Sequence, residues 1–230
     1  AALLVNTTGT ENVAVGALAL DANTSADQNT AVGYSSLSAA TTGGANTAIG
    51  SQAMAANTTG ASNTAVGYLA LDANTTADHN VAIGRDALTA NTTGQQNTSV
   101  GSNSMSVNTT GADNVAVGYA ALDANTTASN NTAIGRSALS ANTTGASNTA
   151  VGFGALVTQT TASSNTAVGE YAAQATTGST NSALGYRALY TNSTGAGNVA
   201  VGANALYANT TAANNVAMGF YALKANTTGT

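Results

Sequence analysis

Three short stretches of the sequence carry oxygen-bearing side chains in the alternation that opens a calcium-binding loop. Residues 21–27 are Asp-Ala-Asn-Thr-Ser-Ala-Asp, residues 72–78 are Asp-Ala-Asn-Thr-Thr-Ala-Asp, and residues 123–129 repeat the pattern without the last acid. An EF-hand loop needs a glycine at its sixth position and a bidentate glutamate at its twelfth. Ala26 and Val32 stand at those two positions in the first stretch. The sequence therefore predicts no metal ion and no cofactor, with calcium binding as the alternative.

The only histidine, His79, is the next candidate for chemistry. Asp78 precedes it, but neighbours in sequence do not form a catalytic triad, and no second titratable group is spaced for acid–base catalysis. The nine carboxylates show no repeated pairing of the kind that glycosidases use. The glycines do not form the G-x-G-x-x-G loop that binds phosphates. We expect no enzymatic activity, and we interpret His79 as a solvated corner residue.

The composition excludes several classes of protein. Of 230 residues, 6% are charged and 4% aromatic, and Pro, Cys and Trp are absent. Ordinary globular domains carry about 25% charged residues, so a repeat array is the first expectation. A net charge of -5 with only four Lys and Arg argues against nucleic acid and anionic membrane surfaces as partners. No apolar run approaches the ~20 residues of a membrane span, so we expect no membrane insertion.

An Asn-x-Ala-(Val/Ile)-Gly core recurs along the whole chain with a period of 17 residues and few substitutions. The cores begin at Asn12, Asn29, Asn46, Asn63, Asn80, Asn97, Asn114, Asn131, Asn148, Asn165, Asn181, Asn198 and Asn215. The unit between Asn165 and Asn181 has 16 residues, and alignment places the gap between Ala175 and Thr176. We interpret residues 1–230 as a single solenoid array that continues beyond both ends in a longer fibre.

Each 17-residue unit is too short for two helices and predicts one coil of a parallel β-solenoid. The Asn-x-Ala-Val-Gly core is rich in β-branched residues and bounded by Gly and Asn, which is typical of a short strand. We expect a second, weaker strand over the x-Ala-Leu-x-Ala segment. Corners are predicted at the core glycine, such as Gly16, and at the Asn-Thr-Thr-Gly stretch. The predicted fold is all-β, with about thirteen coils.

Both side-chain columns of the core strand are restricted, although neighbouring residues point to opposite faces. The Val117 column holds Val, Ile, Leu or Met, and the Ala116 column holds Ala in every unit except at Ser99. Restriction on both faces indicates burial on both. We expect the Val column to fill the coil and the Ala column to face another copy of the chain. The alternative is that tight curvature within the coil demands Ala.

The Asn-Thr-Thr column supports three interpretations. Its Asn residues each begin an N-x-T glycosylation acceptor, as at Asn57 and Asn74. In a solenoid the same column forms a ladder in which each amide bonds its copy one coil away. A regular Thr array could also bind ice, but Thr75 and Thr76 are adjacent and cannot both project from one flat strand face. The ladder is the simplest of the three.

Residues 80–84, Asn-Val-Ala-Ile-Gly, and residues 114–118, Asn-Val-Ala-Val-Gly, resemble the core of the YadA-like head repeats of trimeric autotransporter adhesins. The array is also similar to the related repeats of phage tail fibres and of fibre proteins that end in an endosialidase-type chaperone. The resemblance implies a left-handed β-roll, three chains per fibre, and extracellular attachment at a cell or virion surface. The period departs from the family because Asn-Thr-Thr-Gly lengthens each coil.

Aromatic side chains follow the core glycine in about half of the units, at a position whose variability indicates exposure. They are Tyr34, Tyr68, Tyr119, Phe153, Tyr186 and Phe220. Amphipathic rings suit contact with a glycan or a protein. We interpret the chain as the head or shaft of a homotrimeric adhesive fibre, with a cell-surface protein or glycan as its target. A non-trimeric extracellular solenoid that binds ice or forms filaments is the alternative.

Overall fold

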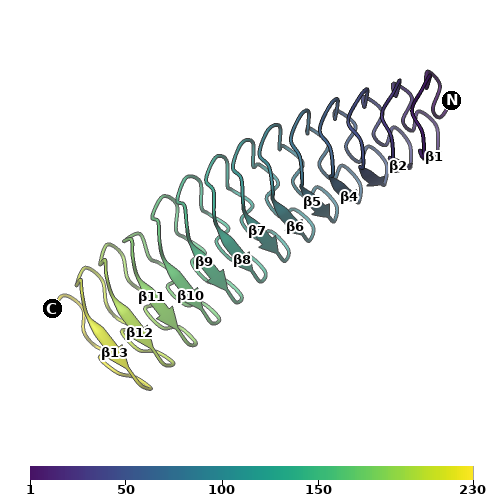
Figure 1. Cartoon of the computed structure of the whole chain (residues 1–230). Helices are drawn as coiled ribbons and strands as arrows, with labels where there is room; N and C mark the ends of the chain where they lie inside the picture. Colours follow the sequence, from purple (N-terminus) through teal and green to yellow (C-terminus); the bar gives the residue numbers. More distant parts are fainter. Residues whose placement is uncertain (230) are drawn as a thin grey trace. The chain divides into compact units, whose positions relative to one another are not determined.

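A computed structural model describes residues 1–229, in which the regular secondary structure is β-strand and no helix occurs. The chain divides into two compact units, residues 1–114 and residues 115 onward, which we describe separately. Each unit is a parallel β-solenoid in which every repeat contributes one short strand (Figure 1). The all-β solenoid predicted from the repeat is therefore confirmed.

The strands are three residues long and coincide with the repeated cores. Unit 1 contains β1 (Val13–Val15), β2 (Thr30–Val32), β3 (Thr47–Ile49), β4 (Thr64–Val66), β5 (Val81–Ile83) and β6 (Thr98–Val100). Unit 2 contains β7 (Val115–Val117), β8 (Thr132–Ile134), β9 (Thr149–Val151), β10 (Thr166–Val168), β11 (Ser182–Leu184), β12 (Val199–Val201) and β13 (Val216–Met218).

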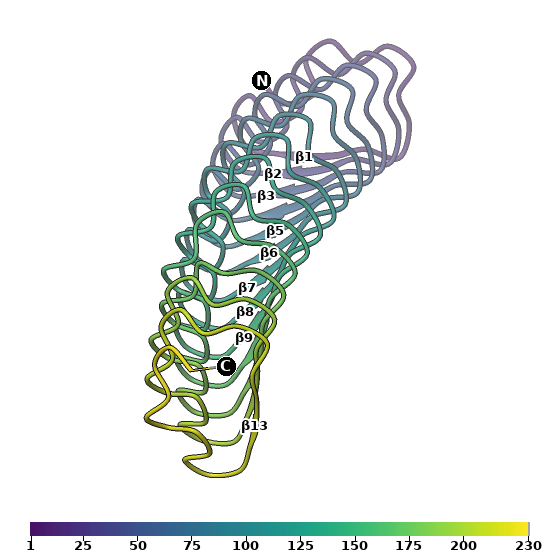
Figure 2. The ribbon, with the colours of Figure 1, turned by 90° about the vertical axis from the view of Figure 1, so that its left-hand side faces the viewer.

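Neighbouring strands within a unit pair in parallel at an offset of one repeat. In unit 1, Thr64 of β4 pairs with Val81 of β5. In unit 2, Thr166 of β10 pairs with Ser182 of β11, so the short repeat keeps the strand register. Figure 2 shows the strands of successive coils side by side along one side of each unit. The repeated cores therefore stack in register, and the shortening is absorbed outside the strands.

The glycine that follows each strand makes a close approach to the next coil. Gly67 has a φ of 141°, and a Cβ atom built on it would lie 2.4 Å from the carbonyl oxygen of Gly84. Only glycine combines this φ with the absence of a side chain. The predicted corner at the core glycine is confirmed.

The second strand predicted over the x-Ala-Leu-x-Ala segment is wrong. Within this segment Leu69 and Leu71 have φ values of 56° and 55°, in the left-handed region, which is incompatible with an extended strand. The backbone still bonds the neighbouring coil, because the Leu71 N–H donates to the Ala87 carbonyl at 3.0 Å. The segment keeps the hydrogen bonds between coils but lacks the extended conformation.

The interior of the coils is filled by alanine and, in every repeat with a buried Leu or Met, by that one larger apolar side chain. In unit 2, Ala116, Ala121 and Leu122 are fully buried, whereas Val117 is half-buried on the outer side of β7. The expectation that Val fills the coil and Ala faces another chain is therefore wrong. The alternative holds, because a narrow, close-packed coil interior leaves room for only a methyl group at this position.

Two asparagine ladders stack the coils. In the Asn-Thr-Thr column, the Asn74 amide donates to Asn57 Oδ1 at 2.8 Å, which confirms the predicted ladder. A second ladder, which the sequence did not reveal, runs through the first residue of each core: the Asn80 N–H donates to Asn63 Oδ1 at 2.9 Å. These asparagines are buried, so the glycosylation reading fails at Asn57 and Asn74 in the folded chain.

The short repeat places its gap differently from the alignment. The Thr176 N–H donates to the Ala173 carbonyl at 3.2 Å, as the ladder residue Asn74 does to Leu71 in a full repeat. Thr176 is buried and occupies the place of the asparagine, so the missing residue lies after it. Because a threonine cannot extend the amide ladder, the ladder is interrupted in this coil.

Candidate functional site

The six aromatic residues predicted as surface contacts are all exposed. Their exposed fractions range from 39% for Phe153 to 71% for Phe220. Tyr34 and Tyr68 lie in unit 1, and Tyr119, Phe153, Tyr186 and Phe220 lie in unit 2. Their exposure is confirmed, and their role as contacts stays a prediction.

Further aromatic side chains, which lie at other positions of the repeat and were not foreseen from the sequence, lie near this column in unit 2. The Tyr171 ring meets the Phe153 ring edge-on at 4.9 Å between centroids. Tyr190 lies 6.5 Å from Tyr171 and stacks on Tyr207 at 5.0 Å. The sequence feature that could have revealed them is the clustering of aromatic residues, since six of the ten fall between positions 171 and 221. Coil stacking brings these side chains together from several repeats.

Arg187 lies among these rings. Its guanidinium carbon is 5.0 Å from the Tyr186 centroid, 5.2 Å from Tyr190 and 5.9 Å from Tyr171. Cation–π contacts of this kind contribute about 0.5–1 kcal/mol at exposed sites. The Arg187 Nε atom is buried without a hydrogen-bond partner. The tyrosine–arginine cluster is defined as Phe153, Tyr171, Tyr186, Arg187, Tyr190 and Tyr207.

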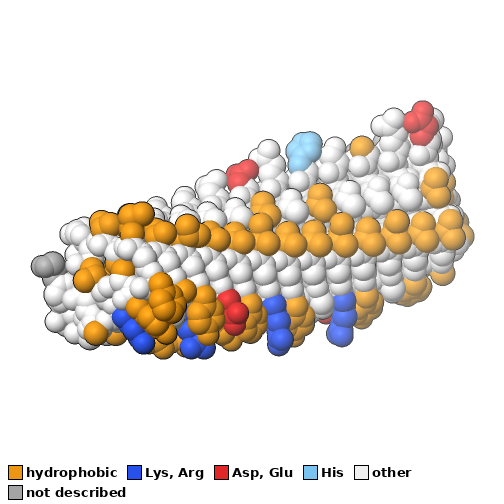
Figure 3. All heavy atoms as spheres, turned by 90° about the horizontal axis from the view of Figure 1, so that it is seen from below, with side chains coloured by type: hydrophobic (Ala, Val, Ile, Leu, Met, Phe, Trp, Pro, Cys, Tyr) orange, Lys and Arg blue, Asp and Glu red, His pale blue; other side chains and the backbone are white. Residues whose placement is uncertain are grey.

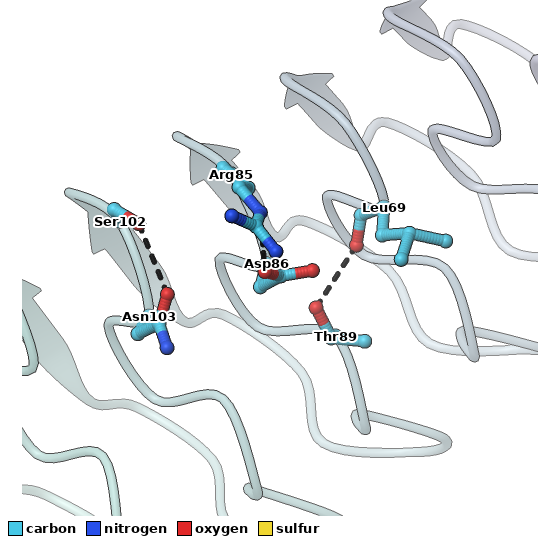
Figure 4. A network of polar contacts seen from close by, with 6 residues as sticks. All are labelled: Leu69, Arg85, Asp86, Thr89, Ser102 and Asn103. Carbon is cyan, nitrogen blue, oxygen red and sulfur yellow. Dashed lines mark hydrogen bonds and ion pairs between the residues drawn. The ribbon is translucent and has the colours of Figure 1, made fainter.

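Arg85 of unit 1 has a different environment. Its Nε atom lies 3.0 Å from Asp86 Oδ2, and 71% of its side chain is exposed. Figure 4 shows this ion pair beside the hydrogen bond that the Thr89 hydroxyl donates to the Leu69 carbonyl. The charge of Arg85 is therefore neutralised within its own coil, without contact to an aromatic ring.

The second surface is the outer strand face, defined as the first and third residues of strands β1–β13. In unit 1 it includes Val81 and Ile83, and in unit 2 Thr132 and Ile134. Ile83 and Ile134 are each 40% exposed. Figure 3 shows hydrophobic side chains in a continuous row along each unit. The outer strand face thus presents a column of Thr, Val or Ser beside a column of Val, Ile, Leu or Met.

The side chains of the first calcium-like stretch, residues 21–27, make hydrogen bonds to the preceding coil. Asn23 is buried and donates to Asn6 Oδ1, whereas Asp27 is exposed and accepts the Thr10 N–H at 2.6 Å and the Thr10 hydroxyl at 2.9 Å. The bond from the Thr10 N–H is the main cause of the lowered pKa of Asp27. Among residues 1–229, no three His, Asp or Glu side chains gather closely enough to hold a metal. The oxygen atoms of the alternation instead bond neighbouring coils.

The other titratable residues lie apart from the aromatic cluster. His79 is exposed at a left-handed φ of 61°, which confirms its interpretation as a solvated corner residue. Partial burial raises the pKa of Asp72 in unit 1 and of Asp123 in unit 2. Both acids occupy the same place in the repeat, next to the buried leucine, so a structural cause explains both shifts.

The chain matches no protein-family model, no curated protein and no solved structure. Within residues 1–229, no helix has the length and apolar character needed to cross a membrane. The two surfaces defined above therefore provide the basis for assigning a function.

Proposed function

We propose that this chain is the head or shaft segment of a homotrimeric adhesive fibre, located outside the cell or on a virion. In this role it has no enzymatic activity, and it contacts a cell-surface protein or glycan through exposed aromatic side chains. Its coils follow the left-handed path of the head repeats that the sequence resembles. One observation carries the proposal: the outer strand face of each unit is regular, largely apolar and open to solvent in the single chain.

Association of copies through the outer strand face follows from the hydrophobic effect. An apolar column that recurs in every coil is larger than the scattered apolar residues of an ordinary monomer surface. The area that it buries against a copy grows with the number of coils. Identical repeats on each chain keep the same spacing, which favours a symmetric assembly. The Val and Ile column therefore replaces the Ala column as the proposed seam, with three chains as the resemblance implies.

A pair of variants tests this seam. Ile83→Asn with Ile134→Asn places one amide on the outer strand face of each unit, so we expect a smaller trimer population with an unchanged β-sheet circular dichroism signal. Ala116→Leu with Ala133→Leu is the control, because these buried positions have no room for a larger side chain. We expect the control to lower the melting temperature instead. Assembly that survives the asparagine pair undiminished would refute the seam.

Ice binding is a second candidate, now supported by a different set of threonines. The Thr58 hydroxyl donates to the Thr75 carbonyl at 3.0 Å, so the Asn-Thr-Thr column uses its hydroxyls within the solenoid. On the outer strand face, however, Thr47 and Ile49 lie on the same side of β3, and Thr64 and Val66 repeat the pair in β4. Such regular hydroxyl and methyl groups on one strand face resemble a surface suited to ordered water.

Thermal hysteresis separates the two candidates. A fibre segment whose outer strand face is covered by its copies leaves the growth of ice crystals unaffected. Thermal hysteresis that disappears when Thr47→Leu and Thr64→Leu roughen the face would favour ice binding over the fibre. Thr59→Leu is the matched control, since this exposed threonine lies outside the outer strand face.

A further inference from the structure

The tyrosine–arginine cluster lies over the most irregular part of the array. The short repeat, residues 165–180, carries Ala173 where the other repeats have leucine or methionine, and Thr176 where they have asparagine, apart from Ala40 and Gln159. The buried atoms Gln174 Oε1 and Thr176 Oγ1 have no hydrogen-bond partner. Buried polar atoms are normally satisfied, and departures from local consistency concentrate at functional sites. The irregular coil therefore marks this region as a candidate site.

Gln174 belongs to the same surface as the rings. The N–H of the following residue, Ala175, donates to the Tyr190 carbonyl at 3.1 Å, which aligns Gln174 with Tyr190 in neighbouring coils. Tyr171, in the same repeat as Gln174, lies 6.5 Å from Tyr190. An amide, a guanidinium group and several phenol groups thus converge on one surface region.

The charge of Arg187 has a different environment from that of Arg85. Among residues 1–229, no carboxylate lies within ion-pair distance of its guanidinium, in contrast to the pair between Arg85 and Asp86 (Figure 4). The rings of Tyr171, Tyr186 and Tyr190 hold the guanidinium in place. An anion arriving at this group would gain charge-assisted hydrogen bonds without first displacing a carboxylate.

We propose that the tyrosine–arginine cluster binds an anionic saccharide, a sugar that carries a carboxylate or a sulfate. The anionic group accepts hydrogen bonds from Arg187, the apolar C–H face of the sugar ring packs on the tyrosine rings, and sugar hydroxyls bond the phenol groups. This ligand matches the positive charge, the aromatic rings and the phenol hydroxyls of the surface. An acidic peptide, by contrast, offers no rigid C–H faces to pack on the rings. The inference rests on the proposed adhesive function and names its target class.

The site is an open surface, because no cavity occurs among the described residues. An open site of a few side chains gives weak binding per chain, with an expected Kd in the range of about 1 mM. Three copies in one fibre would raise the effective affinity through multivalency. Attachment in this account therefore depends on many weak contacts along the fibre.

Titration with defined oligosaccharides, followed by NMR, tests the proposal. The probes are a hyaluronan hexasaccharide, which carries carboxylates, a sulfated maltohexaose, and neutral maltohexaose. We expect at least one anionic probe to bind at least about tenfold more tightly than the neutral one. The stronger of the two anionic probes identifies the carboxylate or the sulfate as the natural group. Equal binding of all three, or of none, would overturn the proposal, as would tighter binding of a hexaglutamate peptide.

Variants locate the binding. Arg187→Gln should weaken binding of the anionic probe about tenfold or more. Arg187→Lys should retain part of the affinity, because lysine keeps the positive charge but lacks the planar guanidinium that bonds an anion through two N–H groups. Arg85→Gln is the matched control and should leave binding unchanged. If Arg187→Gln unfolds the chain, Tyr190→Leu is the substitute, with circular dichroism as the check on folding. Wild-type affinity in a folded Arg187→Gln or Tyr190→Leu chain would contradict the assignment.

Sedimentation of the same samples separates this inference from the proposed fibre. A trimer that binds no anionic saccharide rejects the ligand and keeps the assembly. A monomer that binds the anionic probe through Arg187 supports the ligand and rejects the trimer.

Discussion

The two units share one interior and differ in their surfaces. Unit 1 contains seven of the nine carboxylates and one of the four Lys and Arg residues, which gives it a formal charge of -6. Unit 2 contains two carboxylates and three of the cations, a formal charge of +1, together with eight of the ten aromatic residues. Buried alanines, leucines and asparagines recur in both units. The repeat thus constrains the interior, while the exposed positions are free to acquire different functions.

The largest expected loss of stability comes from changes in the interior that the two units share. Leu88→Ala in unit 1 and Leu139→Ala in unit 2 each remove a fully buried leucine from the same place in the coil. We expect each to lower the free energy of unfolding by about 2–5 kcal/mol, because a cavity remains in a close-packed core. Urea denaturation measures both. A loss in one unit that is several times smaller than in the other would break the claim of a common interior.

A smaller loss of stability is expected from a change beneath the tyrosine–arginine cluster of unit 2. Gly154 lies at a position that other repeats fill with larger residues, and a Cβ atom on it would lie 2.7 Å from the Tyr171 ring. Gly154→Ala should therefore displace this ring and cost about 1–2 kcal/mol.

Near-ultraviolet circular dichroism of the tyrosines should report the displacement. Ser137→Ala is the matched control at the equivalent position of the preceding coil, where the effect should stay within about 0.5 kcal/mol. An unchanged tyrosine signal in Gly154→Ala would show that the ring does not depend on the glycine.

The smallest expected change in stability concerns Asp72 in unit 1 and Asp123 in unit 2, which occupy the same place in the repeat. Because burial raises the pKa of Asp72 and of Asp123, the folded chain binds more protons than the unfolded chain between the unfolded and the folded pKa. The free energy of unfolding therefore falls as pH rises through that window and stays lower above it. Asp72→Asn and Asp123→Asn should each raise stability at pH 7 by less than about 1 kcal/mol, since both side chains are partly solvated.

Urea denaturation at pH 7 and at pH 3 provides the measurement, and the gain should vanish at the lower pH. The two variants should behave alike, because the acids occupy equivalent places in the two units. Lower stability of either variant at pH 7 would mean that the carboxylate makes a favourable contact that outweighs its burial.

The repeat period predicted the solenoid, the position of the strands and the glycine corner, because these follow from local turn and strand preferences. It did not predict the facing of Ala116 and Val117, since both columns are equally restricted in sequence. The left-handed conformations of Leu69 and Leu71 were also hidden, because leucine has no preference for that region. The tyrosine–arginine cluster depends on the path of this non-extended segment, so the sequence revealed only part of it.

The most direct test of the proposed fibre is sedimentation equilibrium of the unmodified chain. The proposed trimer has an expected mass of about 66 kDa, three times the 22.1 kDa of one chain, and it should dissociate when the outer strand face becomes polar. A stable 22.1 kDa monomer at high concentration, with the outer strand face still open to solvent, would contradict it.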